Sequence, residues 1–321
     1  MNETASPAAR LGLRLLLDAL HRRSGAPTTA DEPEQVPGID AWVGRGTIGS
    51  RPLVTGVAMV TPPAGDGHWF AAKTALEQRI GQSLDGGYVL WAPAGADLPQ
   101  REPGRSEFIT RVEAAAAALA PGAGGEVRFP VSLYLRKSDE EGGYITARGG
   151  LAPHWARFTG RVFGHFQLDS TELHRLPSAE GYAGTLIDAI ALTANSLKLG
   201  STETIEADDA WTIQRLSDGT GLTIIGEPPG LESSSGAALR RSIRRTLPAL
   251  RDAMLETVAD ARVIGFVGPY ASFQDQPVGT ALLGMDPALF GGLDLILLAA
   301  DGQVGPILEL TRLSLLGEPS T

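Results

Sequence analysis

Residues 236–267 read GAALRRSIRRTLPALRDAMLETVADARVIGFV and join a long amphipathic pattern to a short apolar run. On a helical projection, the large apolar side chains of the first part fall within one arc of about 100°. They are Leu239, Ile243, Leu247, Leu250, Met254 and Val258. This pattern predicts a helix over Gly236–Asp260 with one buried face, which Pro248 can kink. The run Arg262–Val267 predicts a buried strand directly after the helix.

The solvent side of this predicted helix is strongly basic. It carries Arg240, Arg241, Arg244, Arg245 and Arg251. Like charges four residues apart repel one another, and cations near a helix N-terminus oppose the helix dipole. A bound anion would relieve both effects. Three sources of that anion stay open: phosphate, the carboxylates of a partner protein, or an acidic segment of the chain itself that includes Glu203, Glu206, Asp208 and Asp209.

The chain after this strand predicts a closing β-hairpin. Its strands are Leu293–Ala300 and Val304–Leu313, and Asp301-Gly302 between them is a strong signal for a two-residue type I′ turn. With that turn, Asp294 lies directly opposite Glu309, with Cβ atoms roughly 4.5–5.5 Å apart. Two carboxylates so placed repel one another unless a cation or a proton lies between them.

This order of helix, strand and carboxylate-bearing hairpin is partly similar to the core of the PD-(D/E)XK nucleases. The resemblance implies a metal-dependent cleavage of phosphodiesters, in which Asp294 and Glu309 hold Mg²⁺ or Mn²⁺ and the metal activates water. The chain departs from the family at its lysine position, which falls on Thr311. In addition, Pro306 can introduce a bulge that shifts the strand register.

The rest of the chain mixes strand and helix patterns and predicts an α+β protein, a mixed α/β fold with antiparallel hairpins. Near the N-terminus, Pro52–Val60, Trp69–Leu84 and Gly87–Trp91 predict a β–α–β unit with parallel strands. The C-terminal part predicts an α–β–β–β segment. Further helices are expected at Ser106–Leu119 and Tyr182–Leu199, and further hairpins at Glu126–Arg136 with Tyr144–Arg148 and at Ala210–Arg215 with Leu222–Ile225.

Three regions are expected along the chain. Residues 1–40 combine an amphipathic helix over Leu11–Leu20 with an acidic, proline-containing linker over Ser24–Asp40. Residues 41–178 are expected to form a mixed α/β domain, and residues 179–321 an α+β domain. The single apolar stripe of the N-terminal helix predicts that it docks on the body of the protein, on a partner or on a second copy of the chain.

Composition excludes several classes of protein. The 321 residues include no cysteine, which excludes disulfides, zinc knuckles and thiol catalysis. A formal net charge of −10 argues against a general coat for nucleic acids and against binding to anionic membranes. Arginine far outnumbers lysine, and alanine, glycine and proline are abundant, which is typical of GC-rich bacterial genes. Because Arg14 and Asp18 interrupt the first apolar stretch, no signal peptide is expected, and the predicted location is the cytoplasm.

Other motifs do not assemble into a catalytic set. Gly44, Gly46 and Gly49 match G-x-G-x-x-G, but a strand pattern follows them instead of a helix, so a plain loop is expected. His165 and His174 lack metal-ligand spacing, and Asp169 is expected to cap a helical turn.

The sequence therefore favours a non-catalytic binding or assembly subunit of a bacterial cytoplasmic complex. It would engage an acidic partner or phosphate through the arginine face and would need no cofactor. The alternative is the metal-dependent nuclease-like protein acting on nucleic acid.

Overall fold

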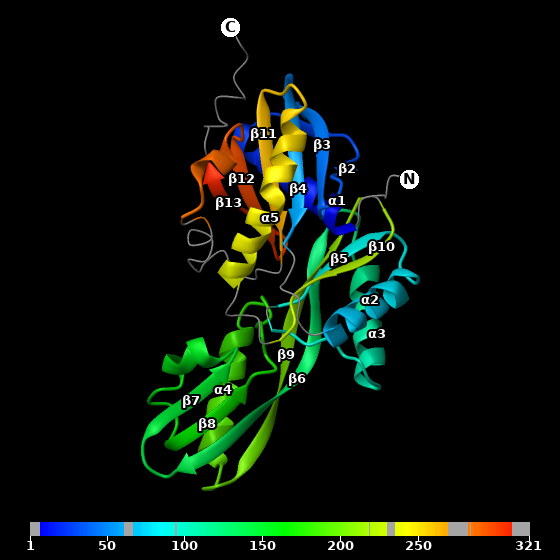
Figure 1. Cartoon of the computed structure of the whole chain (residues 1–321). Helices are drawn as coiled ribbons and strands as arrows, with labels where there is room; N and C mark the ends of the chain where they lie inside the picture. The colour runs from blue at the N-terminus through cyan, green and yellow to red at the C-terminus, as the bar shows by residue number, and fades with distance from the viewer. Residues whose placement is uncertain are drawn as a thin grey trace. The chain divides into compact units, whose positions relative to one another are not determined.

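The computed structural model describes residues 7–60, 67–93, 95–217, 219–229, 235–268, 282 and 284–309. These residues form helices and two β-sheets with mixed strand directions, which confirms the α+β class. The chain divides into two compact units (Figure 1). The first unit contains residues 1–98, 116–124 and 213–321, and the second contains residues 99–115 and 125–212. Because each unit is built from several segments, these units do not coincide with the expected regions 1–40, 41–178 and 179–321.

A mixed sheet forms the centre of the first unit. Its strands are β1 (Thr28–Ala30), β2 (Glu34–Gln35), β3 (Ala41–Ile48), β4 (Arg51–Met59), β11 (Ala261–Val267), β12 (Leu295–Ala300) and β13 (Gln303–Glu309). Their order is β1-β3-β4-β11-β12-β13, and β2 pairs with β3 beside β1. The central strands β4, β11 and β12 run parallel, whereas β3 and β13 pair antiparallel with their neighbours.

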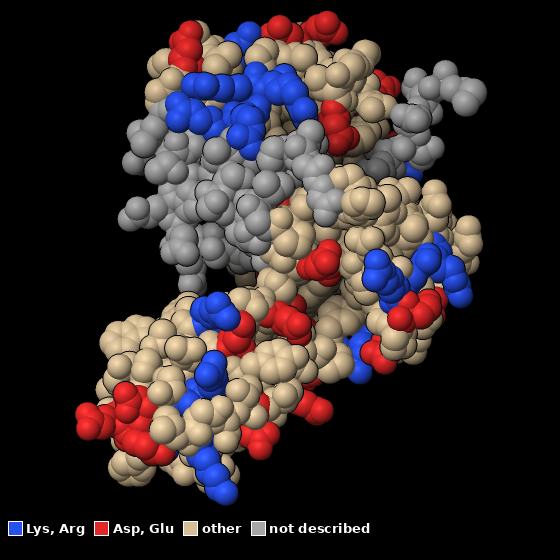
Figure 2. Space-filling model, turned by 60° about the horizontal axis from the view of Figure 1, so that its bottom comes forward, with Lys and Arg blue, Asp and Glu red and all other residues tan. Residues whose placement is uncertain are grey.

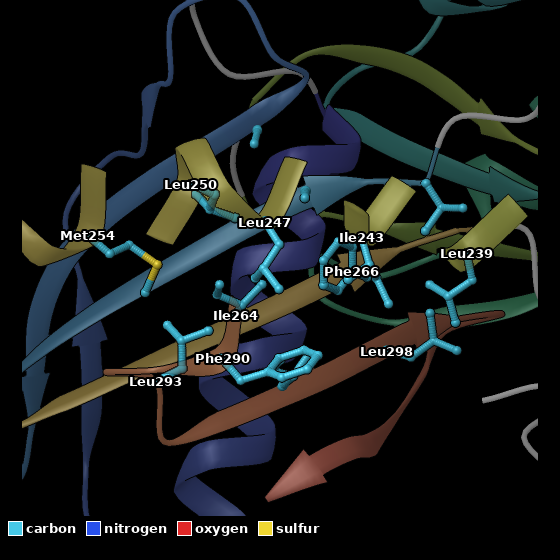
Figure 3. Close-up of a cluster of buried hydrophobic side chains, with 14 of the residues drawn as sticks. Leu239, Ile243, Leu247, Leu250, Met254, Ile264, Phe266, Phe290, Leu293 and Leu298 are labelled. Carbon is cyan, nitrogen blue, oxygen red and sulfur yellow. The ribbon is translucent and has the colours of Figure 1, made fainter. Parts of the chain in front are cut away.

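Two long helices cover the two faces of this sheet (Figure 1). Helix α5 (Ser235–Leu255) packs on one face, where its apolar stripe meets Ile264 and Phe266 of β11 (Figure 3). Helix α1 (Pro7–Ser24) packs on the other face against Val263 and Val267 of the same strand. Because successive side chains of a strand point to opposite faces, β11 contributes to both cores.

The long-helix prediction is confirmed in its buried stripe and corrected at its end. Leu239, Ile243, Leu247, Leu250 and Met254 are buried. Val258 does not belong to the stripe, since α5 ends at Leu255 and the Val258 side chain is 91% exposed. The strand expected after the helix is β11.

The N-terminal helix docks on the body of the protein. Leu13, Leu16 and Leu20 are buried between α1 and the sheet. Its apolar face is therefore already covered and is not open to a partner or to a second copy. The expected linker over Ser24–Asp40 is wrong, because β1 and β2 lie within it and both pair with β3.

The first unit also contains helix α2 (Gly67–Gly81) and the parallel pair formed by β5 (Gly87–Trp91) and β10 (Gly221–Ile225). These elements confirm the predicted strand–helix–strand order. The parallel pairing predicted between the strands is wrong, since β4 pairs with β3 and β11 and β5 lies in another sheet.

The second unit is a four-stranded sheet segment with a helix on one face. Its strands are β6 (Gly124–Asp139), β7 (Gly143–Gly149), β8 (Gly164–Ser170) and β9 (Thr202–Arg215), in the order β9-β6-β8-β7. Helix α4 (Tyr182–Ser196) buries Ile187 and Ile190 against Leu135 and Phe166 of the sheet. Helix α3 (Gly104–Ala117) and the 3-10 helix η1 (Ala152–Arg157) complete the elements of this part.

Two predicted hairpins are wrong for one shared reason. Strand β8 lies between β6 and β7, and β5 lies between β9 and β10, so neither pair of consecutive strands is directly paired. The acidic segment over 201–209 is not a connector but the first half of β9. Of the three predicted hairpins, only the closing one has its two strands paired directly, with Asp301 and Gly302 in the left-handed conformation (φ 53° and 75°) that a type I′ turn requires.

None of the helices in the described residues combines the length and apolar character needed to cross a bilayer.

Candidate functional site

The arginine face of α5 is held outward by the burial of the opposite side of the helix. Leu247 and Leu250 are fully buried against the sheet, and Ser242 and Thr246 are buried beside them. The rotation of α5 about its axis is thereby fixed by packing. Figure 2 shows a group of basic side chains gathered on the first unit.

Arg241 and Arg244 form the open centre of this face. Both residues are exposed and lie three positions apart, so their side chains project from neighbouring turns of α5. Within the described residues, neither guanidinium has an ion pair or a hydrogen bond with another group. These two cations are therefore available to an anion from outside the described part of the chain.

Three other arginines of the predicted face are engaged with the protein. Arg240 is partly buried, and neither Arg240 nor Arg245 is without a partner. Arg251 donates to the carbonyl oxygen of Ala288 (2.8 Å) and pairs with Asp252 (2.9 Å). Arg251 thus fastens the 3-10 helix η3 (Pro287–Phe290) to α5 and is less open than Arg241 and Arg244.

Asp40 adds an acidic group to this site that the sequence pattern did not reveal. Loss of hydration around its carboxyl group raises the pKa of Asp40, and the charges of Arg245 and Lys73 act in the opposite direction. Asp40 belongs to the acidic stretch that was expected to be a linker, and only the fold brings it near Arg245. Part of the positive charge of the face is therefore offset within the first unit.

The acidic segment that was predicted as an intramolecular anion is not a free connector. Asp209 is buried in the second unit and accepts hydrogen bonds from the backbone N–H groups of His174 (2.8 Å) and Arg175 (2.7 Å). It also accepts a bond from the Trp211 indole N–H (2.9 Å). Its role is to hold the segment around residue 174 against β9.

The carboxylate pair predicted in the closing hairpin does not form. The register shifts between Ile296 and Leu297, so that Leu295 and not Asp294 lies opposite Glu309. The shift falls beside Pro306, which has no N–H to donate to the ladder.

Each of the two acids instead has a structural role. Asp294 accepts a hydrogen bond from the backbone N–H of Arg262 (2.8 Å), whereas Glu309 pairs with Arg23 of α1. Among the described residues, no three histidine, aspartate or glutamate side chains gather as a metal site. Thr311, the position matched to the nuclease lysine, lies outside the described residues.

The remaining motifs also have structural roles. Gly44 and Gly46 lie in β3 and not in a loop, and a Cβ atom at Gly46 would lie 1.8 Å from the carbonyl oxygen of Thr29. Asp169 caps no helix: it lies in β8, and hydrogen bonds from Thr171, together with the Arg148 charge, lower its pKa. His165 and Asp169 share this strand, whereas His174 binds Asp209.

A scan against models of known protein families, a search of curated proteins and a search of solved structures each find no match to this chain. The geometry described above is therefore the basis for the function proposed below.

Proposed function

We propose that this protein is a non-catalytic binding subunit of a bacterial cytoplasmic complex, and that it engages an acidic partner or phosphate through the arginine face of α5. The observation that carries this proposal is the pair Arg241 and Arg244. Both are exposed on a helix whose rotation is fixed, and neither has an acidic partner within the described residues.

Electrostatics favours an anion at this position. The i,i+4 pairs Arg240/Arg244 and Arg241/Arg245 each place two like charges on neighbouring turns, which destabilises the helix by a few tenths of a kcal/mol per pair. An external carboxylate or phosphate would remove this repulsion and gain two charge-assisted hydrogen bonds. A chain with a net charge of −10 that keeps an exposed basic cluster also has a localised field able to orient an anionic partner.

The nuclease-like alternative lacks the geometry on which it depended. Its two carboxylates are not paired across the hairpin, and each is bonded to another part of the first unit. The proposal therefore rests on binding and requires no cofactor.

The proposal is tested by measuring the binding of fluorescently labelled polyglutamate and labelled inorganic polyphosphate at low salt. Replacing Arg241 and Arg244 together with alanine removes two exposed charge interactions of about 0.2–1 kcal/mol each. We therefore expect at least one of the two probes to bind about 2-fold to 30-fold more weakly to this variant than to the wild type.

The matched control is the pair Arg22→Ala and Arg79→Ala. These arginines are exposed on α1 and α2 of the same unit, and their removal changes the net charge by the same amount. The control should retain wild-type affinity. Equal losses in the two double variants, or no binding of either probe by the wild type, would refute the proposal.

A further inference from the structure

The second unit exposes one face of its sheet to solvent along β7, β8 and the C-terminal half of β6. Along β6 and β8, the residues that face α4 are buried, including Leu133, Leu135, Phe166 and Leu168. Their neighbours on the opposite face are Tyr134, Arg136, His165, Gln167 and Asp169. Helix α4 covers only one side of these strands (Figure 1). The outward face is distinct from the arginine face of α5, which belongs to the first unit.

Aromatic rings stand at two positions on this outward face. Tyr134 of β6 is 46% exposed and Tyr144 of β7 is 47% exposed, unusual values for large side chains within a sheet. The Tyr144 ring stacks on His165 with centroids 4.4 Å apart. The imidazole is itself fixed, because its two nitrogens lie 3.1 Å from the Ser138 hydroxyl and 3.0 Å from the Thr146 hydroxyl. This stack is rigid and offers an exposed aromatic surface.

Hydrogen-bonding and cationic groups lie between the two aromatic positions. Strand pairing puts Arg136 of β6, Gln167 of β8 and Thr146 of β7 in one row across the sheet. Arg136 is exposed and forms no ion pair within the described residues. Arg148 lies in the next row and pairs with Asp169 (2.8 Å). Of the charged groups in these rows, two are arginines and one is an aspartate, so the face is locally positive.

These side chains line a hollow of about 500 Å³ on the sheet. Tyr134, Arg136, Arg148, His165 and Gln167 all contribute to its wall. A hollow of this size is within the range of small-molecule sites, and its aromatic, cationic and amide groups match the base and phosphate of a nucleotide. Bases stack on aromatic side chains whatever their sequence, and arginine binds the phosphate between them.

The distance between the aromatic positions indicates more than one nucleotide. Tyr134 pairs with Asp169, and Tyr144 pairs with His165, so the two tyrosines lie four residues apart along β8 and two strands apart across it. At about 3.3 Å per residue and 4.8 Å per strand, their backbones are about 16 Å apart. One nucleotide does not reach from one ring to the other, whereas a short single strand does.

We propose that the outward face of the β6-β8-β7 sheet binds single-stranded nucleic acid. One base stacks on Tyr134 and another extends the Tyr144–His165 stack. Arg136 contacts the backbone phosphate between them, and Gln167 and Thr146 supply hydrogen bonds to the bases. A duplex does not fit this chemistry, because its bases are already stacked and paired.

The test is fluorescence anisotropy with labelled dT12 and rU12 at low salt. All proteins carry Arg241→Ala and Arg244→Ala, so that the two open arginines of the α5 face do not contribute to binding. On this background, Tyr134→Ala should weaken binding of at least one of the two strands about tenfold, the effect expected for the loss of one stacked base. Arg136→Ala should weaken binding as well, and should reduce the dependence of affinity on salt by about one phosphate contact.

Phe163→Ala and Arg161→Ala are the matched controls. Phe163 is 77% exposed, and its backbone N–H bonds to Asn195 of α4, while Arg161 pairs with Asp188 on the same helix. Both controls remove an exposed side chain of the same type on the α4 side of the unit and should bind as the parent does. Absence of dT12 and rU12 binding in the parent would overturn the inference. Equal losses in the controls, or a free mononucleotide bound as tightly as the 12-mer, would do the same.

Discussion

Two aspartates of the second unit carry their charges in different surroundings. Asp209 is buried, and donors from His174, Arg175 and Trp211 surround its carboxylate. Asp169 is at the surface, where the Thr171 hydroxyl (2.8 Å) and the Arg148 guanidinium (2.8 Å) donate to it. The first arrangement fixes the fold, and the second holds Arg148 beside the outward sheet face. The backbone donors to Asp209 at His174 and Arg175 could not be predicted from the sequence, because they lie about 35 residues away along the chain.

Asp169 makes the stability of the protein depend on pH. Hydrogen bonds from Thr171 and the charge of Arg148 lower its pKa below the ordinary value of 3.8. A carboxyl group with a lowered pKa in the folded state stabilises that state when the pH is above the group's ordinary pKa. This stabilisation is lost as the pH falls through the lowered pKa. We therefore expect Asp169→Asn to reduce the free energy of unfolding at pH 7, by less than about 1 kcal/mol at this exposed site.

Urea unfolding of wild type and Asp169→Asn at pH 7 and at pH 2.5 measures this effect. The difference between the two proteins should be present at pH 7 and should shrink at pH 2.5. Thr171→Val removes the main donor and should show the same trend in weaker form. A difference of equal size at both pH values would contradict the assignment.

At the scale of elements, periodicity predicted which segments are helices and strands but not how the strands pair. The stripe from Leu239 to Met254 is a local property of the chain, and the structure confirms it. By contrast, β8 lies between β6 and β7 in the sheet, although it begins only after 14 more residues beyond the end of β7. Likewise, β5 lies between β9 and β10, although it precedes β9 by more than 100 residues in the chain. Local turn signals predict a direct hairpin in each case, and the long-range insertion leaves no mark in the sequence near the turn.

The position of the arginines on one side of α5 could be predicted from helical spacing, as the helix itself was. The contacts of the individual arginines could not. Helical spacing places the five arginines on one side of α5. It does not reveal that Arg251 reaches the carbonyl oxygen of Ala288, or that Asp40 comes close to Arg245. Counting from the turn missed the register of Glu309 by one residue, and the bulge that Pro306 was expected to allow accounts for the difference.

Close packing of α5 on the sheet depends on a glycine in β4. A Cβ atom at Gly56 would lie 2.8 Å from the Met254 sulfur and 3.1 Å from two methyl carbons of Leu250. Gly56→Ala should therefore reduce the free energy of unfolding by about 1–3 kcal/mol through overpacking. Met254→Ala removes the nearest atom and by itself leaves a cavity that costs about 2–5 kcal/mol.

The two substitutions should not be additive, because alanine at position 56 fills part of the space that Met254 vacates. Chemical denaturation of both single variants and the double variant gives the coupling free energy. We expect the double variant to be more stable than the sum of the two losses implies. Strict additivity would show that α5 does not approach β4 at this position.

At the scale of the whole molecule, the chain combines an acidic composition with basic and aromatic surfaces on separate units. The first unit presents Arg241 and Arg244 on a helix locked by its buried stripe. The second unit presents Tyr134 and Arg136 on an open sheet. A helix positions the arginines of the first unit, and a sheet positions the tyrosine and arginine of the second. Substitutions on one unit should therefore leave binding at the other unchanged.

The central claim is that the charge of the α5 face binds anions, and a series of charges tests it most directly. Polyglutamate and polyphosphate affinities are measured from 50 mM to 1 M salt for wild type, the double alanine variant at Arg241 and Arg244, and the double glutamate variant. Exposed charges interact over roughly 14 Å at the lower salt concentration and only about 3 Å at the higher one. We expect affinity for at least one probe to decrease from wild type to alanine to glutamate at low salt and the three proteins to converge at 1 M. Equal affinities of all three proteins for both probes at 50 mM salt would contradict the account.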